Sequence, residues 1–326
     1  MSRTIAAVVL LALATGAAAI NAAEPAELRR GIAHEALFGI DMLGSKGIAV
    51  GAGGQILATA DGGKTWSAEK APAPLSLQDV ATNGSRSIAV GQMGSILVRE
   101  GASAWKAVKS GSEERLMSVD INLRGVAVAV GSFGTVLRSE DGGASWRNVA
   151  PDWASMFAAD SAVLGDSFAP HMYGVKVLDN GTAIIAGELS LVLVSTSAEE
   201  PWMLTNRGSV AEGKVDPSLF GLDIRDDGLG LAVGQSGRIL RTTDGGMNWS
   251  PVASGTQAIL LDVLMGDSQK VIVTGMREML SSSDGGERWS HVRGGNIATA
   301  WYSAAARRSG DFLVVGQAGT ILSVPR

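Results

Sequence analysis

A motif with a period of about 40 residues recurs along the chain, and it constrains the fold more than any other feature. In each copy an apolar run ends in glycine, a second apolar run follows, and then come an aspartate–glycine turn and a tryptophan, as in Val130–Trp146. Successive anchor glycines are 40, 40, 56, 47, 41 and 41 residues apart, at Gly51, Gly91, Gly131, Gly187, Gly234, Gly275 and Gly316. This period is typical of a four-stranded propeller blade, so seven copies predict seven blades.

Each repeat contains four short runs that have the character of strands. In the first repeat they are Leu37–Leu43, Gly47–Gly51, Gln55–Thr59 and Thr65–Lys70. The runs are apolar or β-branched and are bounded by Gly, Asp, Ser or Pro, which is typical of strands between tight turns. No sustained helical period with caps is present after residue 23. We therefore predict an all-β fold, a seven-bladed β-propeller of four-stranded antiparallel blades, as one domain over residues 24–326.

The seventh repeat supplies only three strands, near Trp301–Ala306, Phe312–Gln317 and Thr320–Val324. The segment Glu27–Glu35 precedes the first repeat and has the length of a strand. We expect this segment to form the outer strand of the last blade, so that the N- and C-terminal segments share it and close the ring. Closure of this kind covers exposed strand edges.

Four repeats carry the pattern Ser/Thr-x-Asp-x-Gly-x-x-Trp, and weaker versions end at Trp105 and Trp202. Aspartate accepts hydrogen bonds from nearby backbone N–H groups and glycine adopts positive φ, so the pattern predicts a turn. Burial of the tryptophan ring against the next blade contributes about 2–3 kcal/mol. A catalytic or calcium-binding carboxylate is the alternative, but an active site is needed once, whereas a structural element is needed in every blade. The predicted structural pairs are Asp61 and Trp66, Asp141 and Trp146, Asp244 and Trp249, and Asp284 and Trp289.

This pattern is the Asp-box, or BNR repeat, familiar from sialidases. The longer repeats Val130–Trp146 and Gly234–Trp249 resemble the photosystem II stability/assembly factor family, whose repeats read roughly A-V-G-x-x-G-x-I-L-R-T-x-D-G-G-x-x-W. The resemblance covers about residues 36–326. It implies a seven-bladed propeller that acts as a non-enzymatic chaperone for a newly inserted reaction-centre subunit on the lumenal side of the membrane. The chain has no Cys, unlike the lipoprotein members of that family, and its sequence contains no feature that marks a phototrophic host. The resemblance therefore implies the fold more directly than it implies the client.

The first 23 residues have the features of an export signal. Arg3 gives a charged start, Ile5–Ala14 an apolar core, and either Ala17–Ala19 or Asn21–Ala23 a small-residue cleavage site. A retained anchor is the alternative, although the apolar stretch is short for a membrane span. We expect a cleaved signal and a periplasmic protein, or one in the thylakoid lumen if the host is phototrophic.

Composition limits the partners and cofactors that the chain can be expected to bind. The absence of Cys excludes disulfides and thiolate metal sites, and His34, His171 and His291 match no zinc spacing. We therefore expect neither a metal nor another cofactor. The net charge of −5 argues against binding nucleic acid. The expected partner is a membrane protein or membrane complex on the extracytoplasmic side, bound by a monomer.

The two long intervals between anchors place insertions at residues 151–171 and 209–219, in connections between blades. These connections share a face with the turns between second and third strands, where rigid scaffolds carry functional loops. An exposed loop rich in Trp, Met and Phe predicts a patch that binds an apolar partner; the alternative is that the loop folds back and plugs the channel. The candidate partner-binding residues are Trp153, Met156, Phe157, Phe168, His171, Tyr173, Arg307 and Arg308.

The innermost strands line the central channel, and alternation should point some polar residues into it. We expect some of the following to point there: Asp79, Asp120, Asp223, Asp262 and Tyr302. They could bind a cation or form a hydrated lining. A glycosidase would need two carboxylates about 5 or 6.5–9.5 Å apart, which the sequence leaves open. No Tyr–Glu pair with an arginine cluster, as sialidases require, is recognisable. We predict a non-enzymatic scaffold or assembly factor, and keep a carbohydrate-active or carbohydrate-binding propeller as the alternative.

Overall fold

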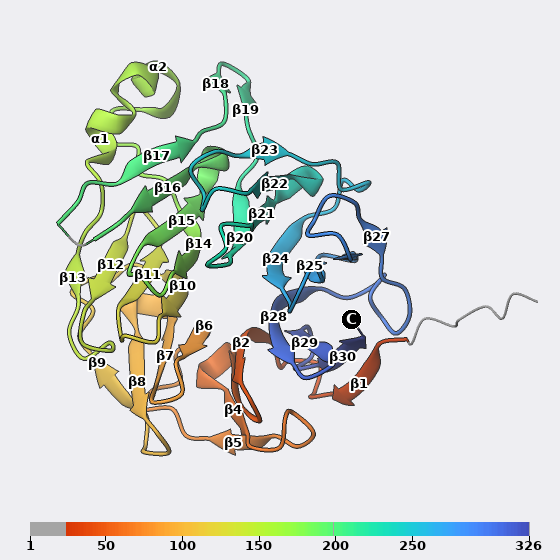
Figure 1. Cartoon of the computed structure of the whole chain (residues 1–326). Coiled ribbons are helices and arrows are strands. Elements are labelled where there is room, and N and C mark those ends of the chain that lie inside the picture. The colour runs from red at the N-terminus through yellow and green to blue at the C-terminus, as the bar shows by residue number, and fades with distance from the viewer. Residues whose placement is uncertain (1–23, 198, 326) are drawn as a thin grey trace, which may run out of the picture.

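The computed structural model describes residues 24–197 and 199–325, and within them seven four-stranded antiparallel sheets are arranged in a ring (Figure 1). This confirms the predicted seven-bladed β-propeller. The predicted export signal lies outside the described residues. Blades 1 to 3 consist of β2 (Leu37–Leu43), β3 (Lys46–Gly51), β4 (Ile56–Thr59) and β5 (Ser67–Glu69); β6 (Leu77–Thr82), β7 (Arg86–Gly91), β8 (Ile96–Glu100) and β9 (Lys106–Val108); and β10 (Leu116–Ile121), β11 (Ala127–Gly131), β12 (Val136–Ser139) and β13 (Arg147–Asn148).

The remaining blades repeat this order, with the first strand of each blade next to the channel and the last at the rim. Blades 4 to 6 consist of β14 (Met172–Val177), β15 (Ala183–Gly187), β16 (Val192–Ser195) and β17 (Met203–Asn206); β20 (Leu219–Ile224), β21 (Gly230–Gly234), β22 (Ile239–Thr242) and β23 (Ser250–Pro251); and β24 (Leu260–Met265), β25 (Val271–Gly275), β26 (Met279–Ser282) and β27 (Ser290–His291). Blade 7 consists of β28 (Tyr302–Arg308), β29 (Asp311–Gly316), β30 (Ile321–Pro325) and β1 (Ala26–Arg29).

Blade 7 closes the ring in the predicted way, because its outer strand comes from the start of the described chain. β1 pairs antiparallel with β30, with Ala26 opposite Ser323. The strand is shorter than the predicted Glu27–Glu35, and the rest of that segment crosses to blade 1. Arg29 fixes the end of β1 by donating hydrogen bonds to the carbonyl oxygen of Gly319 and, over 2.9 Å, to the carboxylate of Glu35.

The hydrophobic core lies between neighbouring blades rather than in one central mass. All residues of β11 are buried, because both faces of this second strand meet another sheet. Its Ala127 and Ala129 pack in a cluster with blade 2, whereas Val128 and Val130 pack in a cluster with blade 4. In blade 3, short side chains on one face and branched ones on the other let the neighbouring blades approach closely.

The aspartates of the four strong repeats make hydrogen bonds within their own turns. Asp141 accepts from the Ser139 hydroxyl over 2.8 Å and from the Ser145 backbone N–H over 2.9 Å. The indole Nε1 of Trp146 donates to the carbonyl oxygen of Gly143 over 2.9 Å. Gly143 has a φ of 86°, and a Cβ there would lie 2.7 Å from the side chain of Ile88 in blade 2. Glycine is therefore needed for both the backbone conformation and the blade contact.

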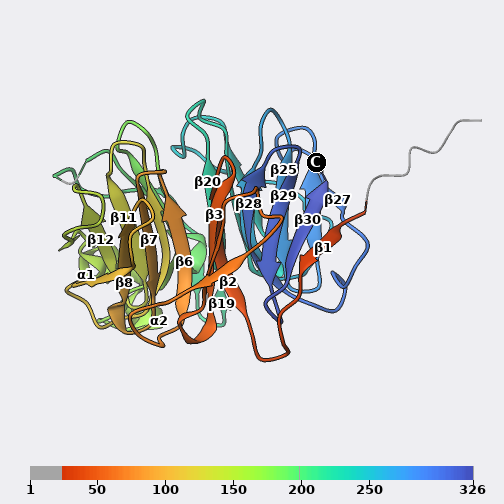
Figure 2. The same ribbon diagram turned by 90° about the horizontal axis from the view of Figure 1, so that it is seen from below.

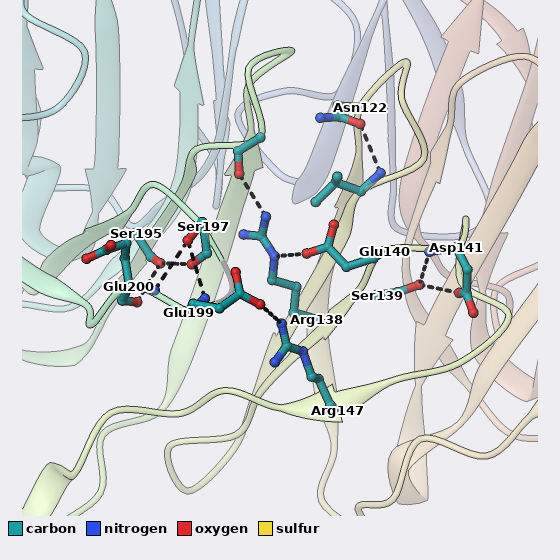
Figure 3. A network of polar contacts seen from close by, with 12 residues as sticks. Asn122, Arg138, Ser139, Glu140, Asp141, Arg147, Ser195, Ser197, Glu199 and Glu200 are labelled. Atoms are coloured by element: carbon teal, nitrogen blue, oxygen red, sulfur yellow. Dashed lines mark hydrogen bonds and ion pairs between the residues drawn. The ribbon is translucent and has the colours of Figure 1, made fainter.

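Blade 4 carries a decayed version of this turn, and side chains of blade 3 bridge to it (Figure 3). The Ser195 hydroxyl donates to the carbonyl oxygen of Ser197 over 2.7 Å, whereas in blade 3 the equivalent hydroxyl donates to an aspartate. Buried Arg138 donates through Nε to Glu140 over 2.7 Å and through Nη2 to the carbonyl oxygen of Gly181 in blade 4 over 3.1 Å. These contacts hold the blade 3–4 junction together where the aspartate is missing.

The turns between second and third strands and the connections between blades lie on one side of the disk, which we call the insertion face. The turns between third and fourth strands lie on the other side, the aspartate-turn face. Residues 151–171 form α1 (Trp153–Met156), η3 (Ala158–Asp160) and α2 (Ser161–Leu164), and the second insertion forms the hairpin β18 (Val210–Ala211) and β19 (Lys214–Val215). Figure 2 shows the disk from the side, with α2 and β19 towards the same edge. Among the described residues, no helix is long and apolar enough to cross a membrane.

Candidate functional site

A cavity of about 780 Å³ runs along the inner strands from one face of the ring to the other. At the insertion face it is lined by large side chains such as Phe38 and Tyr173, and at the aspartate-turn face by the turns that carry Asn122 and Asp226. This cavity is the central channel. Its two ends differ in chemistry.

A ring of seven equivalent positions surrounds the channel mouth at the insertion face, and we call it the collar. In every inner strand the register shifts between the first and third residues, so that the residue between them has no partner opposite it. A bulge of this kind re-aims a side chain, and here it aims seven half-buried side chains at the mouth. The collar residues are Phe38, Gln78, Met117, Tyr173, Phe220, Leu261 and Ser303.

Aromatic contacts organise the collar. The rings of Tyr173 and Phe220 meet edge to face with centroids 4.9 Å apart, and Phe38 stacks on Trp301 at 6.0 Å. Such geometries are favourable for aromatic pairs and hold the rings in place. The mouth of the channel is therefore a preformed, largely apolar rim.

Outside the collar, the turns between second and third strands present apolar side chains from strained backbone. Met93 has a φ of 55° and Phe133 a φ of 51°, a region that is unfavourable for residues with a Cβ. Met93 is 73% exposed and Phe133 is 64% exposed, and the ring of Phe133 lies 4.8 Å from that of His171. The same turn position has positive φ in the other blades too, as at Ser236 and Arg277, so the conformation belongs to the repeated turn. It is the exposure of large apolar side chains there that is typical of binding surfaces. His171 links Phe133 to Tyr173 of the collar, and Met93 adds a further exposed apolar group in blade 2.

Below the collar, five aspartates line the channel and join adjacent blades. Asp79 accepts from the backbone N–H of Val80 over 2.8 Å in its own strand and from that of Val119 in blade 3 over 3.0 Å. The other four also accept an N–H of the next blade's inner strand. The five acceptors are Asp41, Asp79, Asp120, Asp223 and Asp262, and their donors in the next blade are Thr82, Val119, Val177, Met265 and Ala305.

The five carboxylates lie at two levels. Asp79 and Asp262 are the first below the collar, and glycines in the preceding blades make room for them. A Cβ on Gly39 would lie 2.7 Å from the Cα of Asp79, and one on Gly221 would lie 2.6 Å from the Cα of Asp262. The other three aspartates lie one step deeper, at the level of Lys176 of blade 4.

Two basic side chains reach the level of these aspartates, and both pair with the deeper ones. The Lys176 Nζ lies 3.6 Å from Asp120 and 3.4 Å from Asp223, and the Arg307 Nη2 lies 3.5 Å from Asp223. The negative charge of Asp120 raises the pKa of Lys176 above its usual range. Lys176 therefore stays charged at any physiological pH.

The remaining carboxyl groups have no ion-pair partner within the described residues. Burial raises the pKa of Asp79 to about 6 and the pKa values of Asp41 and Asp262 to about 7. These carboxyls therefore change protonation in the neutral range, with less stabilisation of their charged form than Asp120 and Asp223 receive. The described residues contain no group of three or more side chains placed to hold a metal ion.

Of the five candidates for the channel lining, the four aspartates line the cavity and Tyr302 does not. Tyr302 is 1% exposed, and its hydroxyl bonds to the side chain of Asn296. It pairs with Gly316 as Leu37 pairs with Gly51, which is the buried position just before the bulge. Aligning the repeats on their anchor glycines gives this position directly. Sequence reasoning also missed Asp41 and Lys176, which the same alignment places level with Asp120 and Asp223.

The first insertion does not form the exposed aromatic patch that was expected. Trp153 is 8% exposed and Phe157 is 2% exposed, because both pack into the cluster between blades 3 and 4. The indole of Trp153 donates to the carbonyl oxygen of Gly134 over 2.9 Å. Nor does the described insertion line the channel as a plug. It folds back on the rim of the ring.

The other predicted binding residues lie in different surroundings. Met156 and Phe168 pack half-buried against the same cluster as Trp153, while His171 and Tyr173 reach the collar region of the insertion face. Arg307 points into the channel, and Arg308 forms an ion pair with Asp311 on the neighbouring strand. The partner-binding role of these residues stays a prediction.

Comparison with solved structures finds other propellers along nearly the whole chain. YCF48 from Cyanidioschyzon merolae is 19% identical with a TM-score of 0.72, covering 93% of this chain and 99% of that one. A YCF48 bound to D1 peptide is 17% identical with a TM-score of 0.69, covering 93% and 94%. The GH74 xyloglucanase from Xanthomonas campestris is 15% identical with a TM-score of 0.69, covering 93% of this chain and 53% of the enzyme. At these identities the likeness shows the fold. Neither a protein-family model nor a curated protein matches the sequence.

Proposed function

We propose that this chain is a non-enzymatic, extracytoplasmic docking protein that holds a segment of a membrane protein or membrane complex on its insertion face. One observation carries the proposal: a preformed apolar collar around the channel mouth, continued outward by exposed Met93 and Phe133. Exposed apolar surface of this kind suits a partner whose own segment is apolar. The packing of the first insertion against blades 3 and 4 supports a scaffolding role for that loop beside the collar.

A solved propeller of similar fold lends support to this proposal. The YCF48 structure with a D1 peptide is a case in which a seven-bladed ring binds a peptide. The repeat resemblance of the sequence points to the same class of activity. Our proposal for the compartment rests on the features of residues 1–23, and it places the docking face on the extracytoplasmic side of a membrane.

The carbohydrate-active alternative has a structural neighbour in the xyloglucanase. The carboxylates that such an enzyme would use must be free to transfer a proton or attack a sugar. Here the channel aspartates accept backbone N–H groups from two blades, and Asp120 and Asp223 also pair with Lys176. These contacts favour a structural and electrostatic role for the acids, so we propose that the chain is not a glycosidase.

Co-purification from solubilised native membranes tests the docking face. The Met93→Asp/Phe133→Asp variant should lose the membrane partner that the wild-type chain retains, because two charges replace apolar contacts. Asp tolerates positive φ, so the turns should still form. The matched control is Leu43→Asp/Leu123→Asp, which alters exposed leucines on the aspartate-turn face and should retain the partner. Loss of the partner in the control alone, or its retention in the Met93 and Phe133 variant, would contradict the proposal.

A further inference from the structure

The first charged groups below the collar are two aspartates without a basic partner. Asp79 and Asp262 come one position after the collar residues Gln78 and Leu261 in their strands. Within the described residues neither of them forms an ion pair, and the negative charge of Asp79 adds to the effect of burial in raising the pKa of Asp262. Any group that passes through the collar meets these two carboxylates first.

The deeper level of the channel does not compensate for this charge. At the two levels below the collar five carboxylates face two cations, and both cations are engaged with Asp120 and Asp223. A third cation, Arg225, lines the cavity nearer the aspartate-turn face, where it pairs with Asp227 and where Asp179, Asp226 and Asp267 add negative charge. Asp41 lies at that deeper level as well and adds to the negative side. The groups that face Asp79 and Asp262 are therefore Asp41, Asp120, Asp223, Lys176 and Arg307, and together they leave the channel negative when the acids are ionised. A cavity walled by protein concentrates such a field towards its mouth.

Both carboxylates keep acceptor capacity for a further donor. Asp262 accepts from the N–H groups of Val263 over 2.8 Å and Ala305 over 2.9 Å. Asp79 accepts from two N–H groups and from the Ser118 hydroxyl over 2.8 Å. A carboxylate offers about four lone-pair sites, so each aspartate has room for at least one more hydrogen bond.

The collar above matches the stem of a long basic side chain. Met117 and Leu261 offer aliphatic contacts, and Phe38, Tyr173 and Phe220 offer aromatic faces and edges. Lys and Arg bury their methylene stems against such surfaces while the charged end seeks a polar group, and aromatic faces also attract cations. An acidic partner would instead be repelled by the channel.

We propose that the docked partner segment is apolar and carries a lysine or arginine whose side chain passes through the collar to the level of Asp79 and Asp262. This inference rests on the proposed function, because it specifies the chemistry of the segment that the insertion face holds. The collar provides apolar contact area, and the carboxylates below it favour a side chain with a positive charge. Such electrostatic complementarity discriminates between partners that bury similar apolar area.

Three capped pentapeptides test this inference with the purified chain. Each has two leucines and two phenylalanines around a central residue, which is lysine, methionine or glutamate, and binding is measured by fluorescence anisotropy of a terminal dye. At pH 8 the lysine peptide should bind about tenfold more tightly than the methionine peptide, and the glutamate peptide should bind least tightly. Equal affinities for the lysine and methionine peptides would overturn the inference while leaving docking at the collar in place. If none of the peptides binds, both the inference and the docking face are contradicted.

Two variants and a change of pH test whether the carboxylates of Asp79 and Asp262 cause the preference for the lysine peptide. In Asp79→Asn/Asp262→Asn the advantage of the lysine peptide should disappear, whereas Asp226→Asn, at the other end of the channel, should keep it. The double variant should still bind the methionine peptide, which shows that the collar is intact. Lowering the pH from 8 to 5 takes both carboxyls below the pKa values to which burial raises them, so the lysine peptide should lose most of its advantage and the methionine peptide should bind as before. An advantage that survives both the double variant and low pH would overturn the inference.

Discussion

The carboxylate of Asp120 accepts a hydrogen bond from the backbone N–H of Val177 over 2.8 Å, and this contact joins the inner strand of blade 3 to that of blade 4. The same carboxylate accepts from Ile121 in its own strand over 2.9 Å. One side chain thus satisfies a donor on each side of a blade junction. Because equivalent contacts occur at four other junctions, the channel lining holds the ring together as well as giving it a negative interior.

Removal of one such contact should weaken the ring measurably. In Asp120→Ala the Val177 N–H and Lys176 each lose a partner, so we expect a loss of about 1–3 kcal/mol in the free energy of unfolding. Urea denaturation followed by tryptophan fluorescence measures it. Asp179→Ala, at the exposed end of the same channel, is the control and should change stability by less than about 0.5 kcal/mol. An unchanged urea midpoint for Asp120→Ala would show that the contact is not structural.

The channel acids also predict how stability changes between pH 5 and pH 8. Burial raises the pKa of Asp262 to about 7 in the folded chain, so the folded state holds this proton more tightly than the unfolded state does. Stability therefore falls as the pH rises through this range. Asp262→Asn cannot ionise and should gain about 1 kcal/mol relative to wild type between pH 5 and pH 8, a value kept low because the side chain is half-buried. If the difference in the free energy of unfolding between wild type and Asp262→Asn stayed constant with pH, burial would not raise the pKa of Asp262.

For the aspartate turns we predict the opposite trend, because their contribution to stability decreases as the pH is lowered. Hydrogen bonds from Asn248 and Thr242 lower the pKa of Asp244 to about 2. Its stabilising contribution is present above the usual pKa near 4 and is lost as the pH falls towards 2. Asp244→Ala should therefore destabilise the protein clearly at pH 6 and much less at pH 3, as measured by thermal unfolding. Met247→Ala, in the same turn, has no titratable group, and its effect should be the same at both values.

Closure of the ring depends on β1, so its removal should be costly. Deleting residues 24–30 exposes the edge of β30 and removes the contacts of Leu28 with the core between blades 7 and 1. We expect the melting temperature to fall by at least about 5 °C, given that 1 kcal/mol corresponds to roughly 2–4 °C in a protein of moderate size. Calorimetry provides the measurement. A melting temperature equal to that of the full chain would mean that blade 7 does not need its outer strand.

The architecture could be predicted from the sequence because each repeat carries its own pattern of apolar runs, glycines and turn residues. The anchor glycines fixed the number of blades, and the segment before the first repeat was correctly assigned to the last blade. The position of Tyr302 was not predicted correctly, because simple alternation ignores the bulge after the first residue of each inner strand. One shifted residue exchanges the buried face for the channel face.

The surroundings of the first insertion could not be derived from its composition. Trp153 and Phe157 have the residue types of a binding patch, but the same residue types also fill a gap between blades. The choice depends on a tertiary contact, the hydrogen bond from the Trp153 indole to Gly134, which no local pattern encodes. The strained Met93 and Phe133 were likewise invisible, because nothing in the sequence alone reveals positive φ at a residue other than glycine.

The most direct test of the docking face is site-specific photocrosslinking in the native host. A benzophenone amino acid is placed at Phe133 on the insertion face or at Leu123 on the aspartate-turn face, two positions of similar exposure. The crosslinked product is isolated from the membrane fraction and identified by mass spectrometry. We predict that the Phe133 position captures one membrane protein and that the Leu123 position does not. Equal capture from both positions, or capture from Leu123 alone, would contradict docking on the insertion face.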